Sequence, residues 1–580
     1  MLELLTGDPR HQEARSKSDS SDAPQQQEAR SGSDGTGTPP GFVHGNLIPI
    51  SPPDTPMKTQ GYLGIDAGTQ GLSVIFTDAD LKIISSGEGS YDMLPGLGPE
   101  CFEQQPADWE AAVTTAMADL RRKLAAMQVE MEVLAIGISG QMHGEVLTDA
   151  SGEPVGPVRL WCDGRNEAEG HELTERLGAK CPKRMTAVRW LWTIRNRPEQ
   201  AARTAHLTTP AGWIAQRLTG GRVLGIGDAS GMFPIDQDTL DFDQRMLSEF
   251  DTLANAAAAA SLPGTALPRL AELLPAVRRA GDDGGTLNAH GAGLLGLPQG
   301  VPVAPAEGDQ PAALAGSLIA APGQVSMSFG TSVVANSVGD RAFVGISRAI
   351  DHFCAPDGRP INMVWLRNGT TAMNMVVSMF GGDFAAIMPQ VLTAADDCGG
   401  LLALPFMDDE PGLGVTRGGT ALVIGLSDTA ATPGNAVKAM LLATIFNLRL
   451  GSEELDRQGY PRTEIVLSGG LVKTPQLGQL IADAFNAPVT ILAGGAEGTA
   501  WGSALLAKFG QETRAGRADN WAGFLAAQQA GSPTRFTQQP AQVAALNQLF
   551  DRYRRLVGLH GQLEAVGCQS SLSAEQGATD

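Results

Sequence analysis

Two glycine–threonine turns, far apart in the sequence, carry the residues best suited to hold a polyphosphate. The first is GIDAGTQG at residues 64–71 and the second is FGTS at residues 329–332, and each follows or ends an apolar run that predicts a strand. Glycine lets the backbone approach an anion closely, and consecutive N–H groups in such a turn form a concave anion site. Asp66 places a carboxylate beside the first turn, where a phosphate-bound Mg²⁺ could lie. The pair of turns therefore predicts two half-domains that close on one polyphosphate.

Another acid is placed like a general base. Asp309 lies in the segment EGDQ, residues 307–310, after an apolar run at 301–304 and before a small-residue helix predicted over 312–319. It has glycine before it and no basic residue nearby. A hydroxyl that attacks a phosphoryl group must lose its proton, so this chemistry requires a base. The alternative is that Asp309 only caps the following helix.

Three further segments offer contacts for a small polyhydroxyl ligand. The loop GQMHG at 140–144 follows a strand predicted over 133–138 and brings an amide, a thioether and an imidazole together, although a lone histidine is often a core residue. In LWCDGR, residues 160–165, Asp163 and Arg165 could be no more than a surface ion pair. In GDASG, residues 227–231, Asp228 either caps a helix or contacts a substrate hydroxyl, and local sequence does not decide.

Two glycine-containing segments near the carboxyl end suit a nucleotide. SGG at 468–470 follows a strand predicted over 465–467 and precedes a helix predicted from residue 475, a turn whose N–H groups suit phosphate or ribose. EGTAWGSA at 497–504 opens a helix of small residues, for which close packing under the nucleotide is the expected role.

The elements that must position these residues alternate in type. Periodicity predicts further strands over 62–65, 72–76, 81–84, 325–328, 362–365 and 422–424, and further helices over 106–127, 435–450, 475–485 and 539–563. Such alternation predicts an α/β fold in which helices cover sheets.

Length, charge and cysteine content narrow the class of protein. A chain of 580 residues is too long for one core, and its net charge of −21 argues against a nucleic-acid partner. We expect no membrane span and no secretory signal, and the six scattered cysteines predict reduced thiols in a cytoplasmic protein. Residues 1–58 have a disordered composition, and Met57 is the expected true translation start.

Taken in order, these motifs resemble the FGGY carbohydrate kinases of the actin, Hsp70 and sugar kinase superfamily, over about residues 61–507. The resemblance implies two ribonuclease-H-like domains around a central cleft. These would be a sugar-binding domain at 59–318 and an ATP-binding domain at 319–510, flanked by the tail at 1–58 and a helical extension with a polar tail at 511–580. Asp309 would be the catalytic base, and Asp66 would orient Mg²⁺ through water.

The resemblance also implies the remaining site residues. The residues expected to bind ATP are Gly68, Thr69, Gln70, Gly330, Thr331, Gly469, Gly470 and Thr474. Those expected to bind the sugar are Gln141, Met142, His143, Asp228, Asp309 and Gln310. The GQMHG loop is similar to that of the xylulokinase-like branch, whereas Gln310, the segment 409–411 and Trp501 depart from the family pattern.

The predicted function is therefore ATP-dependent phosphorylation of a ketose, D-xylulose to D-xylulose 5-phosphate being the first choice. Ribulose, a tetrulose or sedoheptulose is an alternative substrate, and a homodimer is possible because relatives often pair. A non-catalytic ATP-binding regulator and an actin- or Hsp70-like ATPase are the competing functions. Retention of Asp309 argues against the regulator, and the GQMHG loop argues against the ATPase.

Overall fold

The computed structural model describes residues 57–492, 498–528 and 532–567. Most of the expected tail at 1–58, the proposal about the translation start and part of the segment 497–504 lie outside these ranges. The boundary of the tail is corrected at its end, because Met57 and Lys58 already belong to the first strand, β1 (Met57–Ala67).

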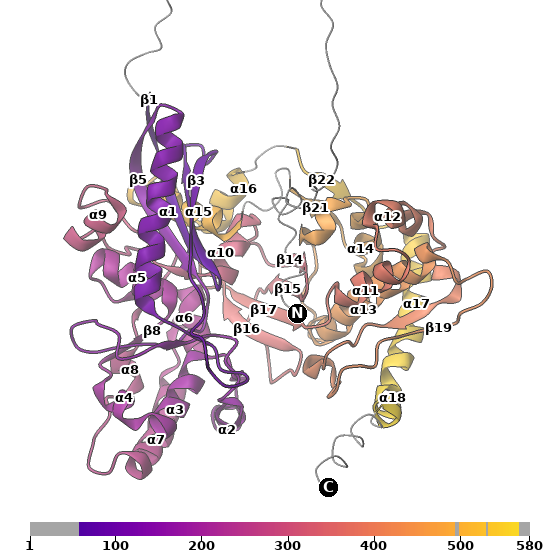
Figure 1. Cartoon of the computed structure of the whole chain (residues 1–580), viewed down its shortest axis with the longest axis horizontal. Helices are drawn as coiled ribbons and strands as arrows, with labels where there is room; N and C mark the ends of the chain where they lie inside the picture. The colour runs from indigo at the N-terminus through magenta and orange to yellow at the C-terminus, as the bar shows by residue number, and fades with distance from the viewer. Residues whose placement is uncertain (1–56, 493–497, 529–531, 568–580) are drawn as a thin grey trace, which may run out of the picture. The chain divides into compact units, whose positions relative to one another are not determined.

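The first sheet has five strands in the order β13-β5-β1-β2-β3 (Figure 1). Strands β1, β2 (Gly71–Thr77) and β3 (Ile83–Ser90) form an antiparallel meander. Strands β5 (Val129–Gly140) and β13 (Glu307–Gly308) lie on the other side of β1 and run parallel to it.

The second sheet repeats this arrangement within seven strands, in the order β16-β17-β15-β14-β20-β21-β22. Its antiparallel members are β14 (Gln324–Phe329), β15 (Val333–Val338), β17 (Pro360–Leu366) and β16 (Ile350–Cys354). Strands β20 (Glu464–Gly469) and β21 (Val489–Ile491) run parallel to β14, and β22 (Thr534–Phe536) closes the edge. The repeated connectivity confirms the predicted α/β class with two similar domains.

Helices cover both sheets where the apolar pattern predicts them. Helix α1 (Pro106–Ala126) packs on β2 and β3 through Trp109, Val113, Met117 and Leu120, residues three or four apart that share one face. Helix α13 (Pro433–Arg457) crosses the core of the second domain. The expected helices at 475–485 and 539–563 correspond to α14 (Leu477–Phe485), α17 (Pro540–Gly558) and α18 (His560–Gly567).

The other elements connect these layers. The remaining helices are α2 (Glu167–Leu177), α3 (Thr186–Asn196), α4 (Pro198–Arg203), α5 (Pro210–Thr219), α6 (Ile226–Met232), α7 (Gln244–Ser261), α8 (Leu270–Leu273), α9 (Ala289–Leu295), α10 (Asp309–Gly316), α11 (Thr371–Met379), α12 (Phe384–Thr393), α15 (Gly498–Arg514) and α16 (Trp521–Ala527). The remaining strands are β4 (Glu103–Gln104), β6 (Val146–Thr148), β7 (Val158–Arg159), β8 (His206–Thr208), β9 (Val223–Gly225), β10 (Ile235–Asp236), β11 (Asp241–Phe242), β12 (Ala276–Arg278), β18 (Leu402–Leu404) and β19 (Leu422–Ile424).

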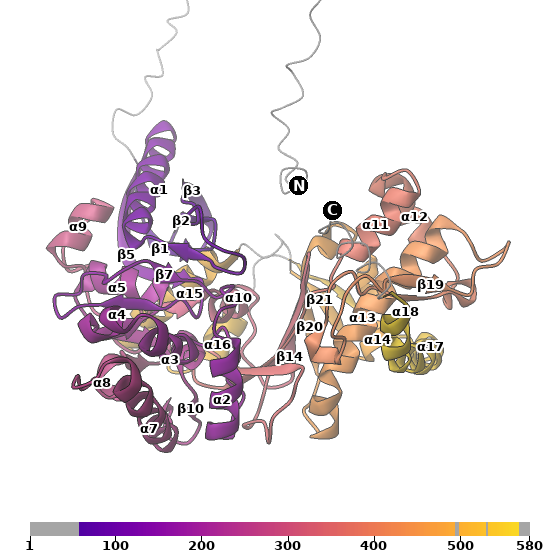
Figure 2. The ribbon, with the colours of Figure 1, turned by 60° about the horizontal axis from the view of Figure 1, so that its bottom comes forward.

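Helix α15 follows six of the seven strands of the second sheet in the chain but packs on the first sheet, against β1, β5 and α10 (Figures 1 and 2). Glycines in the sheet permit the approach: a Cβ at Gly64 would lie 1.9 Å from the carbonyl oxygen of Ala500, and one at Gly137 would lie 1.8 Å from that of Ser503. The expected boundary at residue 510 therefore does not separate the two packing units. Helix α16 joins the same core as α15, whereas α17 packs with the second domain.

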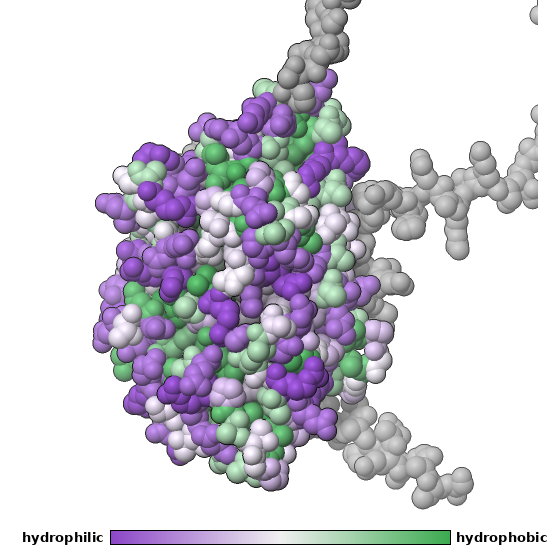
Figure 3. Space-filling model, turned by 90° about the vertical axis from the view of Figure 1, so that its left-hand side faces the viewer, coloured by the Kyte–Doolittle hydropathy of each residue, from purple (hydrophilic) through white to green (hydrophobic). Residues whose placement is uncertain are grey.

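Apolar side chains are gathered mainly in these cores. On the face drawn in Figure 3, hydrophilic and hydrophobic residues are interspersed, as expected for a surface that meets water. Within the described ranges, no single helix is long and apolar enough to cross a membrane. Only α11 and α12 taken together pass that test, and they meet at 102°.

Candidate active site

Three neighbouring strands of the first sheet, β1, β5 and β13, place their polar residues at one edge of the sheet. Asp66 near the end of β1 lies opposite Ser139 of β5, and Ser139 in turn lies opposite Glu307 of β13. Because parallel strands end at the same edge, the first glycine–threonine turn, the GQMHG loop and Asp309 all leave the sheet there. Residues more than two hundred positions apart in sequence are thus brought together.

Asp66 is held by two hydroxyl groups. Its Oδ1 accepts a hydrogen bond of 2.7 Å from Oγ of Ser139, and its Oδ2 accepts one from the hydroxyl of Thr499 on α15. Burial raises the pKa of Asp66 above its ordinary value, and the two hydroxyl donors act against that rise. No local pattern in the sequence predicts the contact of Thr499 with Asp66, because it depends on the packing of α15 on the first sheet.

Asp309 is the half-buried first residue of α10. Burial, together with the negative charge of Asp66, raises the pKa of Asp309 to about 7. The helix cap is Gly308, and no side chain caps the helix. The alternative in which Asp309 merely caps α10 is therefore wrong.

Asp309 lies on the wall of a cavity of about 650 Å³ formed by both domains. Thr331 and Ser332 of the second glycine–threonine turn line the same cavity, so the predicted base and one phosphate turn share one space. The other lining residues are Glu100, Phe102, Met142, His143, Trp161, Cys162, Gly164, Lys183, Arg184, Gln310, Val334, Phe353, Met363, Trp365, Arg367 and Asp408.

Polar contacts join the two walls of this cavity. Arg184 forms an ion pair with Asp351 of β16, and Nζ of Lys180 lies 2.7 Å from the same carboxylate. On the floor, Nδ2 of Asn336 donates a hydrogen bond of 3.2 Å to Oε1 of Gln310. Gln310, predicted to contact the sugar, lines the cavity and contacts Asn336 of the second sheet.

His143 is fixed as a neutral ring. Its Nδ1 lies 2.9 Å from the carbonyl oxygen of Gly231, which can only accept, so Nδ1 carries the proton. Burial, with a contribution from the positive charge of Arg184, lowers the pKa of His143 well below 6.5. Nε2 is then left as a hydrogen-bond acceptor on a residue that lines the cavity. Met142, the preceding residue, lines it as well.

Two predicted sugar ligands are not among the residues that line the cavity. Gln141 is buried behind the first phosphate turn, where its Nε2 donates to Oε1 of Gln104 at 2.8 Å, and Gln104 donates to the carbonyl oxygen of Thr69 at 2.7 Å. Asp228 is also buried and accepts a hydrogen bond of 2.6 Å from Thr209. Burial, with a smaller contribution from Asp309, raises the pKa of Asp228 to about 8.

Several hydrogen bonds hold the first glycine–threonine turn in place. Its Gly68 N–H donates to the carbonyl oxygen of Gly71 at 2.9 Å, and the hydroxyl of Tyr91 donates to that of Gly68 at 2.6 Å. The indole N–H of Trp161 donates to Oγ1 of Thr69 at 3.0 Å, and Gln70 is exposed. The hydroxyl of Thr69 thus keeps its own proton available for a phosphate oxygen.

The segment SGG at 468–470, predicted to bind the nucleotide, lies beside the second glycine–threonine turn. Phe329 of β14 and Gly469 of β20 are paired in parallel register, so Gly330 and Gly470 leave the second sheet side by side. Gly469 has φ 77°, and a Cβ there would lie 2.6 Å from the carbonyl oxygen of Phe329. Thr474 follows the short 3₁₀ helix Gly470–Lys473. Gly68, Thr69, Gln70, Gly330, Gly469, Gly470 and Thr474 are not among the residues that line the cavity.

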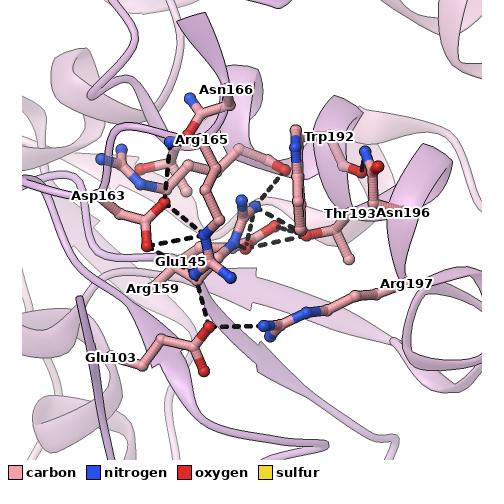
Figure 4. A network of polar contacts seen from close by, with 12 residues as sticks. Glu103, Glu145, Arg159, Asp163, Arg165, Asn166, Trp192, Thr193, Asn196 and Arg197 are labelled. Atoms are coloured by element: carbon pink, nitrogen blue, oxygen red, sulfur yellow. Dashed lines mark hydrogen bonds and ion pairs between the residues drawn. The ribbon is translucent and has the colours of Figure 1, made fainter. Parts of the chain in front are cut away.

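The LWCDGR segment belongs to a buried network (Figure 4). Arg165 lies 2.6 Å from both Asp163 and Glu103, and Asp163 is fully buried, so the expected surface ion pair is instead an interior one. Burial raises the pKa of Asp163, but Arg165 more than offsets this and holds it below the usual value. Arg159 and Glu145 form a second buried pair at 2.7 Å. The network anchors the segment that places Trp161 and Cys162 on the cavity wall.

Two sheets of similar connectivity, each with a glycine–threonine turn at the carboxyl end of its first strand, are typical of the actin, Hsp70 and sugar kinase superfamily. Family comparison identifies the family: residues 61–316 match the N-terminal domain and residues 326–510 the C-terminal domain of the FGGY family of carbohydrate kinases. The chain belongs to this family, and it is a carbohydrate kinase.

Curated relatives and solved structures agree with this assignment. The chain is 27% identical over 447 residues to the xylulose kinase of Haemophilus influenzae, covering 74% of this chain and 87% of that protein. It is 27% identical to the xylulose kinase of Streptomyces rubiginosus, covering 83% and 89%. The fold is similar to that of xylulose kinase from Rhodospirillum rubrum, with TM-score 0.72 and 21% identity over 87% of this chain and 99% of that one. Gluconate kinase from Lactobacillus acidophilus has TM-score 0.74 and 18% identity, covering 88% and 100%.

Proposed function

We propose that the protein transfers the γ-phosphoryl group of ATP to a ketose, D-xylulose to D-xylulose 5-phosphate, with Asp309 as the general base. The observation that carries this proposal is the shared cavity, in which Asp309 faces the same space as Thr331 of the second phosphate turn. The curated relatives named xylulose kinase support the choice of sugar.

Asp309 suits the task of a base at neutral pH. A general base works best when its pKa lies near the operating pH, because it is then both ionised and able to take up a proton. The pKa of about 7 that burial and Asp66 give to Asp309 meets this condition. In this proposal Asp309 takes up the proton of the attacking sugar hydroxyl. The oxygen of that hydroxyl then bonds to the γ-phosphorus as the bond between the γ-phosphorus and ADP breaks.

We assign the nucleotide to the two glycine–threonine turns and the Gly469-Gly470 segment. The hydroxyls of Thr69 and Thr331 and the N–H groups around Gly68 and Gly330 would contact phosphate oxygens. The adenosine would then extend along the edge of the second sheet toward Thr474.

Asp66 is the residue that we assign to Mg²⁺. Mg²⁺ in phosphoryl-transfer sites is commonly held by one or two carboxylates together with the phosphates of the substrate, so we assign it to Asp66 and the phosphates of ATP. The carboxylate of Asp66 has lone pairs beyond the two that accept hydroxyls, so it fits this role. When bound, Mg²⁺ supplies neutralisation of the phosphate charge.

The acceptor sugar is assigned to the part of the cavity near His143 and Met142. Nε2 of His143 can accept a hydrogen bond from a sugar hydroxyl, and Trp161 and Phe353 offer apolar surfaces to a carbon chain. Gln141 and Asp228, predicted as direct ligands, are assigned instead to support of this wall.

The test is a coupled ADP-release assay with pentuloses, hexuloses, heptuloses, polyols and aldonates as acceptors. We expect D-xylulose to give the highest kcat/KM, and the Asp309→Asn variant to lose at least about a hundred-fold in kcat while binding ATP normally. A different sugar with a higher kcat/KM would overturn the choice of substrate. ATP turnover that ignores every acceptor, or an active Asp309→Asn variant, would overturn the proposed function.

A further inference from the structure

Helix α6 is a short, buried helix that packs against Met142 and His143, two residues that line the cavity. All seven of its residues are buried, and its cap position is Gly225, which has no side chain to offer to the helix N–H groups. Two of its residues make contacts outside the helix: the carbonyl oxygen of Gly231 accepts the hydrogen bond from His143, and Oγ of Ser230 accepts the N–H of Cys354 in the second domain. A third, Asp228, has its pKa raised by burial and to a smaller extent by Asp309. The position of this helix is therefore tied both to His143, which lines the cavity, and to strand β16.

The cap of α6 comes from another strand. Glu307 of β13 is 1% exposed, and its Oε2 accepts the N–H of Asp228 at 2.9 Å while its Oε1 accepts that of Gly227 at 3.3 Å. These are the donors that a local capping side chain would satisfy. A Cβ at Gly225 would lie 2.3 Å from Cδ of Glu307, so the glycine makes room for the incoming carboxylate.

The capped helix is bonded onward to the second domain. The hydroxyl of Ser230 donates to the carbonyl oxygen of Gly227 at 2.5 Å, and its Oγ accepts the N–H of Cys354 at 2.9 Å. Cys354 ends β16, and Phe353 of the same strand lines the cavity. A continuous set of hydrogen bonds thus runs from Glu307, two residues before Asp309, to the opposite wall.

We propose that Glu307 is a positioning residue that caps α6 from β13 and thereby fixes Asp309 relative to the cavity wall supplied by β16. This inference rests on the role of Asp309 in the proposed function. It makes Glu307 and Ser230 members of one unit, because each supplies one link of the same hydrogen-bonded path. Interactions that act as a unit give non-additive losses when they are removed together.

The test is a double-mutant cycle on kcat with Glu307→Gln and Ser230→Ala. The amide of Gln has the size of the acid but presents an NH₂ group to one of the two N–H donors, so one link is lost without a cavity. We expect kcat to fall about ten-fold for Glu307→Gln and about five-fold for Ser230→Ala, and the double variant to fall no more than about ten-fold. The KM for ATP should change less than about two-fold in all three variants.

Asp243 provides the matched control, because it caps α7 by accepting the N–H of Met246 at 2.8 Å and is not among the cavity residues. Asp243→Ala should keep kcat within about two-fold of the unmodified protein, and its effect should multiply with that of Glu307→Gln. A merely structural role for Glu307 would make the two capping variants behave alike at a temperature where both are folded.

Two results would overturn the inference: a Glu307→Gln variant with more than half the normal kcat, or a double variant whose loss is the full product of the single losses. If Glu307→Gln does not fold, Ser230→Ala decides, and normal kcat in that variant overturns the inference. Failure of the proposed function is distinguishable, because it would appear as activity in Asp309→Asn whatever Glu307 does.

Discussion

The raised pKa of Asp309 makes the pH dependence of catalysis a sharp test of its role. A rise from the ordinary 3.8 to about 7 means that the folded site disfavours the carboxylate by roughly 4 kcal/mol, at about 1.4 kcal/mol per pH unit. A base must be ionised to act, so activity is present above pH 7 and lost as the pH falls. At pH 5 about 1% of Asp309 would be ionised, and kcat/KM for the sugar should be about a hundred-fold below its plateau.

The measurement is kcat/KM for the sugar between pH 5 and 9 at saturating ATP, which reports ionisations before the sugar binds. The KM for ATP, measured at each pH, separates an effect on the nucleotide from one on the base. Circular dichroism at pH 5 shows whether the protein is folded there. Asp309→Asn supplies the matched variant, because its small residual rate should lose the slope below pH 7.

An ordinary carboxylate would give a different curve. With a pKa near 3.8, more than about nine-tenths of Asp309 would be ionised at pH 5, and the rate would be nearly constant down to that pH. A flat profile from pH 5 to 8 in folded protein would therefore refute the argument from burial and from the charge of Asp66.

Three substitutions test other parts of the site. Thr499→Val removes a hydroxyl donor to Asp66 and should lower kcat about ten-fold, as measured by ADP release. Gly469→Ala introduces a Cβ at φ 77° against the backbone of β14 and should weaken ATP binding at least about ten-fold in isothermal titration. Arg159→Ala leaves the buried carboxylate of Glu145 without its ion-pair partner and should lower the free energy of unfolding by about 3–5 kcal/mol in denaturant titration.

Each of these has a control in the chain. Thr499→Ser keeps the hydroxyl and should keep kcat. Gly470→Ala meets its nearest backbone atom at 3.3 Å, without a positive φ, and should bind ATP better than Gly469→Ala. Arg122→Ala removes an exposed ion pair with Asp119 and should cost less than about 1 kcal/mol. Equal effects within any variant–control pair would contradict the corresponding argument.

Much of the fold was predictable because its signals are local. The strands expected at 62–65 and 325–328 lie within β1 and β14, and the periodic segment at 106–127 became α1, with ends moved by at most five residues. The expected strand at 81–84 begins only at Ile83, because Leu81 has φ 67° in the turn that precedes β3. The order of the motifs likewise predicted that Asp309 and Thr331 lie near one another, and both line the same cavity.

The supporting contacts could not be predicted, since they depend on residues far apart in sequence. Gln141 faces Gln104 instead of the cavity, and nothing within the GQMHG loop indicates that partner. The separation of Thr499 from Asp66 by 433 positions is bridged only by the packing of α15 on β1. Glu307 is a comparable case, because the N–H groups that its side chain accepts belong to Gly227 and Asp228 of α6, 80 and 79 positions earlier in the chain.

The return of α15 to the first sheet governs how this protein can be divided. A recombinant piece ending before residue 498 would leave the faces of Gly64 and Gly137 uncovered, together with apolar neighbours such as Tyr62 and Ala135. The N-terminal half would then lack part of its core, and the C-terminal half would leave the apolar faces of α15 and α16 uncovered, so co-expressed halves should reassemble while each alone aggregates. Synthesis of the first domain is therefore finished only after most of the second has been made.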